Sequence, residues 1–399
     1  MAKKGKKRPG RDQREPDYFL ILVAVALLLI GLLMVYSTTF DWGYLDRGDP
    51  FHHLKRQLMW VSLGGITAAT LACIDYGYWQ RWAVPLLAAT LAVLVLLLVV
   101  GDWLWGARRA FTNGSIQPGE LAKLATVIYA AAWASSKGDQ IRDVTYGLIP
   151  FAIWMGGVAG LVTLQPDLSA VVILIMAGFA VFFLAGAHLG QLLVSGAVGG
   201  GVFWSMVALY PYAQRRIVEF IAGLQDPTIL PYHPRQALYA LASGGLLGTG
   251  LGAGREKFGY LPMAHNDTIF AALGEELGLI GCLLVIGLFA LLAWRGFRIA
   301  VRAQDHFGSL LACGLTSLLV FQATLNIGAV TSLLPFTGTT LPFISLGGSS
   351  LGISMAAVGL LVSISRGRSR REQHVDEGVD RGGRNGRTRL SRSGRPTGT

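Results

Sequence analysis

The stretch YFLILVAVALLLIGLLMVY, Tyr18–Tyr36, decides the fold class because it holds no charged side chain. An apolar helix of about 20 residues is long enough to cross a hydrocarbon core of roughly 30 Å. A basic segment, residues 1–17, precedes it, and no small-residue cleavage site follows. The apolar run is also longer than the core of a signal peptide, so we expect a retained first transmembrane helix.

Similar apolar runs recur along all 399 residues, of which 52% are hydrophobic and 14% charged. A soluble domain averages about 25% charged residues. We therefore predict an all-α polytopic membrane protein of about ten transmembrane helices, with a large extracytoplasmic loop, 211–266, between the seventh and eighth. The predicted spans are residues 18–38, 55–74, 82–101, 119–136, 144–164, 168–186, 189–210, 268–294, 307–328 and 341–365.

The net charge of +11 lies almost wholly in the two tails of the chain. Basic tails beside membrane spans follow the positive-inside rule, and an even span count returns both termini to the cytoplasm. We predict a basic cytoplasmic tail, 1–17, a ten-helix membrane domain, 18–366, and a disordered Arg-rich cytoplasmic tail, 367–399. No aromatic-interleaved basic patch or zinc-ligand spacing accompanies the charge, which argues against nucleic acid as a partner.

Two similar motifs open predicted spans from the same, outer side of the membrane. QPGELAK, residues 117–123, places Glu120 and Lys123 three residues apart on one helix face, where they can pair. QPDLS, residues 165–169, contains Gln165 and Asp167. Charged residues at span ends usually lie in the membrane interface with no special role. Two such entries on one side favour a shared polar cavity.

The segment HNDTIF, His265–Phe270, puts Asp267 directly before the eighth predicted span. Asp is a preferred helix N-cap, so capping alone would explain this residue, and a lone His265 is usually structural. Arg255 and Lys257 precede the segment. The basic residues close to Asp267 in the sequence favour a functional site. Asp267 could cap the helix and act in catalysis at the same time, because the two roles are compatible.

Two further outer segments carry polar residues. Arg108 and Arg109 lie in the compact stretch WGARRAF, and basic residues retained on the outer side suggest an anionic partner. The stretch Asn326–Ser350 is rich in Gly, Pro and hydroxyl residues, and it ends in Ser349 and Ser350. Such a stretch between apolar runs is typical of discontinuous helices around membrane substrate sites.

These motifs lie between about residues 18 and 366. In the order in which they occur along the chain, they together resemble the SEDS family (shape, elongation, division and sporulation). The resemblance implies a peptidoglycan glycosyltransferase that polymerises lipid II into β-1,4 glycan strands and releases undecaprenyl diphosphate. It implies a multi-pass protein of the bacterial cytoplasmic membrane that works with a class B penicillin-binding protein and other divisome or elongasome proteins. The ending TTLPFISLGGSS looks more like the division members than the elongation members.

The resemblance also implies roles for individual residues. The family's essential acid corresponds to Asp267, which becomes the expected catalytic base. The expected substrate-binding residues are Arg108, Arg109, Glu120, Lys123, Gln165, Asp167, Arg255, Lys257, His265, Ser349 and Ser350. The chain departs from the family pattern at Asn266, Thr337 and Leu346, where the family often has Thr, Lys and Tyr; a phosphate contact therefore cannot be carried over to Thr337.

The expected chemistry is an inverting displacement at an anomeric carbon. A general base removes the proton of the attacking hydroxyl, which contributes about 10²–10⁴-fold to the rate, and outer cations stabilise the departing diphosphate. No metal-ligand spacing is present, so a magnesium or manganese ion is an optional aid and no cofactor is required by the sequence. A lipid II flippase and a membrane scaffold that recruits a penicillin-binding protein are the alternatives. A flippase would need polar groups along the whole crossing, whereas a polymerase keeps them on one face.

Overall fold

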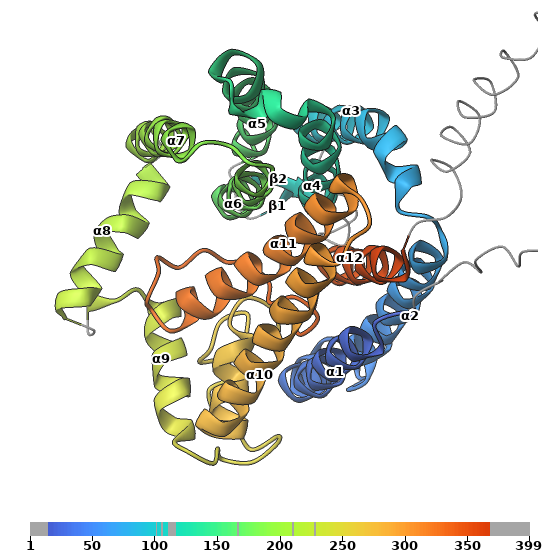
Figure 1. The fold of residues 1–399 in the computed structure, drawn as a ribbon. Helices are drawn as coiled ribbons and strands as arrows, with labels where there is room; N and C mark the ends of the chain where they lie inside the picture. Colours follow the sequence, from blue (N-terminus) through green and yellow to red (C-terminus); the bar gives the residue numbers. More distant parts are fainter. Residues whose placement is uncertain are drawn as a thin grey trace, which may run out of the picture. The chain divides into compact units, whose positions relative to one another are not determined.

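The computed structural model describes residues 15–100, 102–104, 107–110, 117–165, 167–209, 211–226 and 229–367. The predicted tails therefore lie outside the described residues, apart from positions 15–17 and 367. Figure 1 shows the arrangement of the elements. The α-helices are α1 Tyr18–Arg47, α2 His52–Cys73, α3 Gly77–Val100, α4 Pro118–Lys137, α5 Ile149–Thr163, α6 Leu168–Leu184, α7 Leu189–Leu209, α8 Pro211–Gln225, α9 Tyr232–Gly244, α10 Ile269–Val301, α11 His306–Val330 and α12 Gly348–Arg366.

Each of the ten predicted spans overlaps one of these helices, and the predicted large loop contains α8 and α9. Within the described residues, six helical segments are both long and apolar enough to cross a membrane, and α6 is a shorter apolar helix. The chain is thus a multi-pass helical membrane protein, while the count of ten and the placement of the loop stay predictions. The six segments are Tyr18–Leu45, Gly77–Val99, Val144–Thr163, Ile269–Val301, His306–Val330 and Gly348–Arg366.

One short hairpin departs from the predicted all-α fold. Strands β1, Asp102–Leu104, and β2, Ala107–Ala110, pair antiparallel between α3 and α4. Only two residues, 105–106, separate them, a spacing typical of a tight hairpin, and the second of these is a glycine. The apolar pattern of the spans could not indicate this element, because it lies outside the spans.

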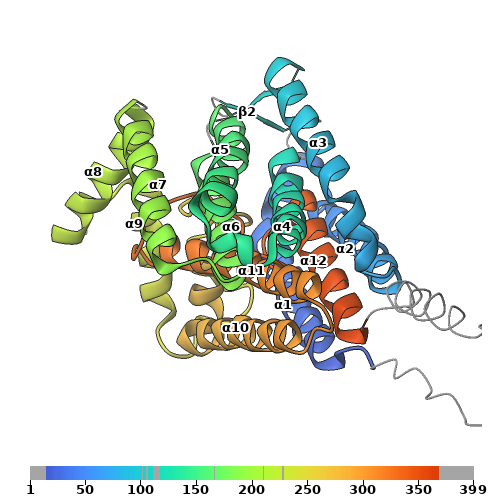
Figure 2. The same ribbon diagram turned by 45° about the horizontal axis from the view of Figure 1, so that its top comes forward.

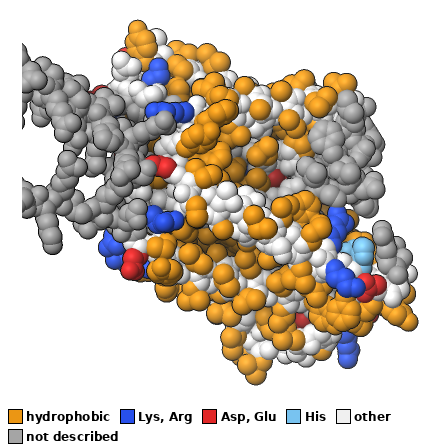
Figure 3. All heavy atoms as spheres, turned by 90° about the vertical axis from the view of Figure 1, so that its right-hand side faces the viewer, with side chains coloured by type: hydrophobic (Ala, Val, Ile, Leu, Met, Phe, Trp, Pro, Cys, Tyr) orange, Lys and Arg blue, Asp and Glu red, His pale blue; other side chains and the backbone are white. Residues whose placement is uncertain are grey.

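The helices pack around α11 and α12, which are the most buried of the six long apolar segments. Helix α12 packs against α2, and α11 packs against α4, α6 and α10. Figure 2 shows α4–α7 running beside one another, with α10 strongly inclined to them. The face in Figure 3 is mainly apolar, and its Lys and Arg side chains gather toward the left and right margins. An apolar belt between charged ends is the surface that a bilayer requires.

Helix α10 is broken at Gly278, where φ is 68° and ψ is −167°. The glycine-rich segment 245–250 lies against the break and bonds to its backbone, as where the amide of Leu279 donates to the carbonyl oxygen of Gly245 at 2.9 Å. A Cβ atom on Gly278 would lie 2.3 Å from the backbone nitrogen of Gly248. Interrupted helices persist in membranes where the freed backbone groups find such partners.

Candidate active site

A cavity of about 700 Å³, here called the larger cavity, opens among the ends of several helices. Its wall combines the starts of α2, α4 and α6, the segment before α10, part of α11, and the segment 331–347 before α12. The predicted topology places all of these ends on the outer side. Its polar and charged lining residues are Arg56, Gln57, Gln117, Glu120, Lys123, Asp167, Ser169, His265, Asn266, Asp267, Gln322, Thr339 and Thr340.

The predicted Glu120–Lys123 pair forms in the wall of this cavity. The Lys123 Nζ atom lies 2.8 Å from Glu120 Oε2, and the two side chains are 3% and 12% exposed. The same Nζ atom donates to Gln322 Oε1 at 2.9 Å. A buried ammonium group needs an ion-pair or hydrogen-bond partner, because an unpaired charge away from water is very costly in free energy. Lys123 is therefore a fixed positive group.

Gln322 connects three parts of the wall. Its side-chain amide donates to the carbonyl oxygen of Thr340 at 3.1 Å and to Ser350 Oγ at 3.2 Å. The hydroxyls of Thr340 and Ser350 lie 2.8 Å apart. Ser350 is thus buried between α11 and the segment 331–347, and it is not among the residues lining the larger cavity. The structure places this predicted substrate-binding serine behind the cavity wall.

The two Gln-Pro entries meet at the larger cavity, as predicted, but only some of their residues face it. Asp167 lines the cavity and caps α6, accepting from the amide of Ala170 at 3.1 Å. Gln165 is buried and donates to the carbonyl oxygen of Leu94 at 3.2 Å, so it bonds to α3 instead. Ser349 accepts a hydrogen bond from the amide of Gln117 at 3.0 Å and does not line the cavity.

The interpretation of Asp267 as a helix N-cap is wrong. Helix α10 begins at Ile269, and Thr268 occupies the N-cap position with no side-chain capping bond. The Thr268 hydroxyl instead donates to the carbonyl oxygen of Pro262 at 2.8 Å. The backbone carbonyl of Asp267 accepts from Asn326 Nδ2 at 2.8 Å. One position before the cap, the Asp267 side chain lines the larger cavity.

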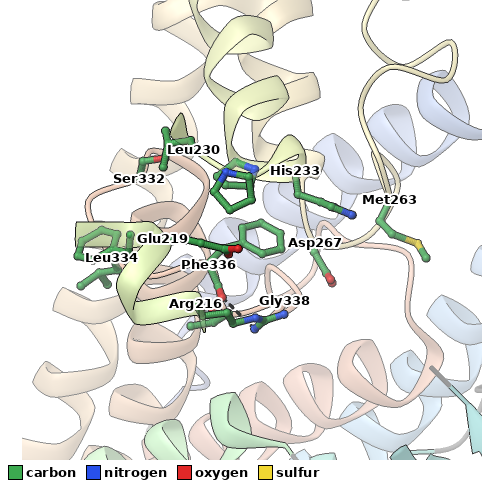
Figure 4. Close-up of a pocket in the computed structure, with 14 residues that line it drawn as sticks. Arg216, Glu219, Leu230, His233, Met263, Asp267, Ser332, Leu334, Phe336 and Gly338 are labelled. Atoms are coloured by element: carbon green, nitrogen blue, oxygen red, sulfur yellow. Dashed lines mark hydrogen bonds between the residues drawn. The ribbon is translucent and has the colours of Figure 1, made fainter. Parts of the chain in front are cut away.

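A second cavity of about 350 Å³, the smaller cavity, adjoins the first, and Met263, Asp267 and Gly338 line both. Its charged contributors from α8 are Arg216 and Glu219, and Arg216 Nη1 donates to the carbonyl oxygen of Phe336 at 2.9 Å. Figure 4 shows the Arg216 guanidinium extending toward the side of the cavity where Asp267 lies. Asp267 therefore stands at the junction of two cavities.

His265 lines the larger cavity within an aromatic stack. The Trp42 ring lies 4.7 Å from the His265 ring and 4.0 Å from the His53 ring, measured between centroids, and both pairs are stacked. Burial lowers the pKa of His265 to about 4, and the nearby His53 adds to the shift. His265 is consequently neutral at pH 7 and contributes hydrogen-bonding capacity to the site, not positive charge.

Two of the remaining basic residues predicted for substrate binding, Arg255 and Lys257, lie away from the lining of these cavities. Lys257 forms a buried ion pair with Glu276, with Nζ 2.7 Å from Oε1, and the backbone amide of Arg255 donates to Glu275 Oε1 at 2.5 Å. Neither basic residue lines either cavity. Arg108 and Arg109 belong to β2, whose side chains lie outside the described part of the chain.

The sequence analysis did not single out several residues that line the cavities. Arg56 and Trp60 come from the start of α2, and Arg216 comes from α8. Gln322 had a usable signal, because an uncharged polar residue inside the apolar run 307–328 is expensive in a membrane unless it has a partner. Arg56 had no such signal, since basic residues near span ends are common. Arg216 is one of several basic residues in the long loop 211–266, and long loops translocate largely regardless of charge.

The fold and the cavities define a polytopic membrane protein with a carboxylate, a buried lysine and arginine side chains gathered at one end of its helices. More particularly, the chain belongs to the FtsW/RodA/SpoVE family, described as cell cycle proteins, whose model matches residues 18–370.

Individual relatives agree with this assignment. The chain is 40% identical to the probable peptidoglycan glycosyltransferase FtsW of Trichlorobacter lovleyi, over 88% of this chain and 94% of that protein. It is 39% identical to the stage V sporulation protein E of Bacillus subtilis, over 88% and 97%. The likeness to relatives named FtsW fits the preference within the family that the sequence indicated.

Two solved structures resemble the fold. One, from work on the structural coordination of polymerization and crosslinking by a peptidoglycan synthase complex, has a TM-score of 0.72 at 28% identity, covering 88% of this chain and 98% of the other. The rod shape determining protein RodA of Thermus thermophilus has a TM-score of 0.65 at 29% identity, covering 89% and 98%.

Proposed function

We propose that this protein is an inverting peptidoglycan glycosyltransferase that polymerises lipid II at the outer face of the bacterial cytoplasmic membrane. The observation that carries the proposal is the position of Asp267 at the junction of two cavities. A polymerase must bring together two lipid-linked sugars, one that supplies a hydroxyl and one that supplies an anomeric carbon. A carboxylate between two adjoining cavities is placed to serve both.

Asp267 acts as the general base in this proposal. The hydroxyl oxygen of one sugar attacks the anomeric carbon of the other, and the carboxylate takes the hydroxyl proton. The bond from that carbon to the diphosphate oxygen breaks, so undecaprenyl diphosphate leaves. Direct displacement inverts the configuration at the anomeric carbon and converts an α-linked donor into a β-1,4 linkage.

The charge that grows on the departing diphosphate needs positive groups nearby. Arg56 and Lys123 line the larger cavity. Lys123 is already held by Glu120 and Gln322, so it presents a preoriented charge that needs no reorganisation during the reaction. Arg108 and Arg109, assigned by the family resemblance, complete the proposed set.

A magnesium or manganese ion is not given a step in this mechanism. Among the described residues, no three His, Cys, Asp or Glu side chains converge as metal ligands do. Magnesium is usually held by one or two protein carboxylates together with waters and substrate phosphates. Asp267 or Asp167 would hold such an ion only jointly with the diphosphate of a bound substrate, where the ion would help neutralise the departing charge.

We also propose that the protein works with a class B penicillin-binding protein, with both termini in the cytoplasm. The fold resemblance to a structure from a peptidoglycan synthase complex supports a crosslinking partner. The family likeness to the division-type members favours a place in the divisome over one in the elongasome.

The test uses purified full-length protein with lipid II, with and without a partner transpeptidase, and measures glycan chains by gel or mass spectrometry. We expect Asp267→Asn to abolish polymerisation while the variant still inserts in the membrane. Asp226→Asn is the matched control, because Asp226 lies in the same outer segment, is exposed and lines neither cavity. Near-normal chains from the Asp267 variant would reject the base assignment.

The flippase alternative predicts a different result in the same preparation. Lipid II would cross the bilayer of a reconstituted vesicle, and no glycan would form. The charged lining residues of both cavities come from one end of the helices, which supports polymerisation over transport. Lipid II crossing without glycan synthesis would favour the flippase.

A further inference from the structure

We infer that the smaller cavity is a second diphosphate-binding site, with Arg216 as the residue that binds the phosphates of a lipid-linked substrate. This inference rests on the proposed polymerase function. It concerns the side of Asp267 that faces away from Lys123 and Arg56, and it assigns a role to α8 and α9, which none of the sequence motifs covers.

Arg216 is held in a defined orientation. Its Nη1 donates to the carbonyl oxygen of Phe336 at 2.9 Å, and its guanidinium carbon lies 6.0 Å from the centre of the Phe336 ring. A guanidinium carries five donor N–H groups, so it can donate to a backbone carbonyl oxygen and also bind phosphate oxygens. Stacking on a ring and a backbone anchor together reduce the entropy lost when Arg216 binds a ligand.

Arg216 is the basic side chain of this lining, and it faces the carboxylates of Asp267 and Glu219 in the same lining. The other ionisable groups of the lining besides Asp267 are Glu219 and His233. Glu219 pairs with Arg215 on the next turn of α8, at 3.3 Å, so its charge is compensated. Burial, and then the charge of Arg216, lower the pKa of His233, which keeps that imidazole neutral at pH 7.

A diphosphate is the ligand that fits this arrangement. Arginine binds phosphate oxygens through paired N–H donors more specifically than lysine does. Both substrates of the proposed reaction carry a diphosphate, and Asp267 is shared by the two cavities. One substrate per cavity therefore brings the hydroxyl of one and the anomeric carbon of the other to the same carboxylate. The ligand in the smaller cavity is either the departing diphosphate or the one that the hydroxyl-supplying substrate keeps.

Two neighbouring arginines provide the test. Arg215→Gln and Arg216→Gln each remove one positive charge from α8, but only Arg216 lines the cavity, and Arg215 is 81% exposed. We expect Arg216→Gln to weaken binding of undecaprenyl diphosphate by about 10- to 100-fold, the range for a lost hydrogen bond to a charged group. Arg215→Gln keeps Arg216 but removes the partner of Glu219, so it should weaken binding much less than Arg216→Gln does. Native mass spectrometry or microscale thermophoresis on the full-length protein in detergent measures the Kd without turnover.

Kinetics with lipid II separate the two sources of the diphosphate. If the cavity holds the substrate that keeps its diphosphate, Arg216→Gln raises KM and leaves kcat near its natural value, because the interaction is equal in ground and transition states. If the cavity holds the departing diphosphate, kcat falls as well, because its charge grows in the transition state. Either pattern supports the inference. Arg216→Lys should recover part of the loss.

Equal undecaprenyl diphosphate Kd values for Arg216→Gln, Arg215→Gln and the natural protein would overturn the inference, even if the protein polymerises lipid II. The thermal unfolding midpoint of each variant shows whether the anchor to Phe336 matters for folding alone. If undecaprenyl diphosphate binding depends on Arg216 but the natural protein forms no glycan from lipid II, the proposed polymerase function fails and the anion site stands.

Discussion

The side-chain amide of Asn326 donates to the backbone carbonyl of Asp267 at 2.8 Å and to that of Thr339 at 2.5 Å. Asn326 lies in α11 and is 1% exposed. Its amide therefore ties a central helix to both segments that meet at the cavity junction. The Asn326 side chain therefore helps to fix the backbone that carries the Asp267 carboxylate.

Replacing Asn326 by Leu should leave two buried carbonyl oxygens without their donor. Each such loss costs about 1–3 kcal/mol. We expect a lower thermal unfolding midpoint and a fall in kcat for glycan synthesis that is larger than the change in KM, because Asp267 loses its position. Asn326→Gln keeps the amide and serves as the matched control. Unchanged kcat in the Leu variant would show that Asn326 does not position Asp267.

Lys123→Met should destabilise the protein more than the double variant Glu120→Gln with Lys123→Met. The single change leaves the Glu120 carboxylate without the ammonium 2.8 Å away, and breaking a buried pair costs about 3–5 kcal/mol. The double change removes both charges. Thermal unfolding in detergent, followed by tryptophan fluorescence, compares the variants. A double variant as unstable as the sum of the two singles would contradict a buried pair.

Gly338→Ala should impair catalysis. Its φ of +69° disfavours any side chain, and an added Cβ would lie 3.2 Å from Asp267 Oδ2. We expect a fall in kcat as the carboxylate shifts, together with a loss of stability of about 1–3 kcal/mol from backbone strain. Gly156→Ala in α5 is the control, since a Cβ there meets no atom within 4 Å. Equal kcat in both variants would reject the crowding of Asp267.

The protein should lose stability in mild acid through His265. Its folded pKa of about 4 lies below the ordinary 6.5, so the unfolded chain takes up the proton first. The stabilisation is complete above pH 6.5 and is lost as the pH falls toward 4, by about 1.4 kcal/mol for each pKa unit of the shift. His265→Phe keeps an aromatic partner for Trp42. The unfolding midpoint of this variant should vary less with pH over that interval, and an identical pH profile would exclude His265.

Lys257→Met should lower stability and leave the KM for lipid II unchanged. Lys257 and Glu276 are 5% and 1% exposed, and Lys257 Nζ also lies 2.8 Å from Ser37 Oγ. The variant leaves the buried carboxylate of Glu276 without its ion-pair partner, which lowers stability. Neither Lys257 nor Glu276 lines a cavity, so substrate binding should not change. Unfolding and steady-state kinetics on one preparation measure both effects. A raised KM with normal stability would restore the substrate-binding role predicted from the sequence.

The sequence predicted the helices and the meeting of the polar motifs better than it predicted the task of each polar residue. Apolar runs indicate spans directly, and the paired entries at Glu120 and Asp167 follow from their common side. The sequence does not show which of two neighbouring polar side chains points into the cavity. Gln165 and Asp167 are two residues apart, yet one bonds to α3 and the other lines the cavity.

The predicted start of the last span shows a second limit of prediction from hydrophobicity. The prediction begins it at residue 341, but α12 begins at Gly348. The apolar side chains of 341–347 belong to the non-helical wall, where the Ser345 hydroxyl donates to the carbonyl oxygen of Asn266 at 2.7 Å and Phe343 has a φ of +66°. Hydrophobicity reports burial, and it cannot separate a buried helix from a buried irregular segment.

The break in α10 at Gly278 has a consequence for how this protein can diversify. The segment 245–250 supplies hydrogen bonds to the two sides of the break, so its length is fixed by the helix it contacts. A one-residue insertion or deletion there would misalign every one of these bonds. In a saturation library, positions 248 and 278 should therefore accept glycine alone, and the whole segment should reject length changes that other surface connections absorb.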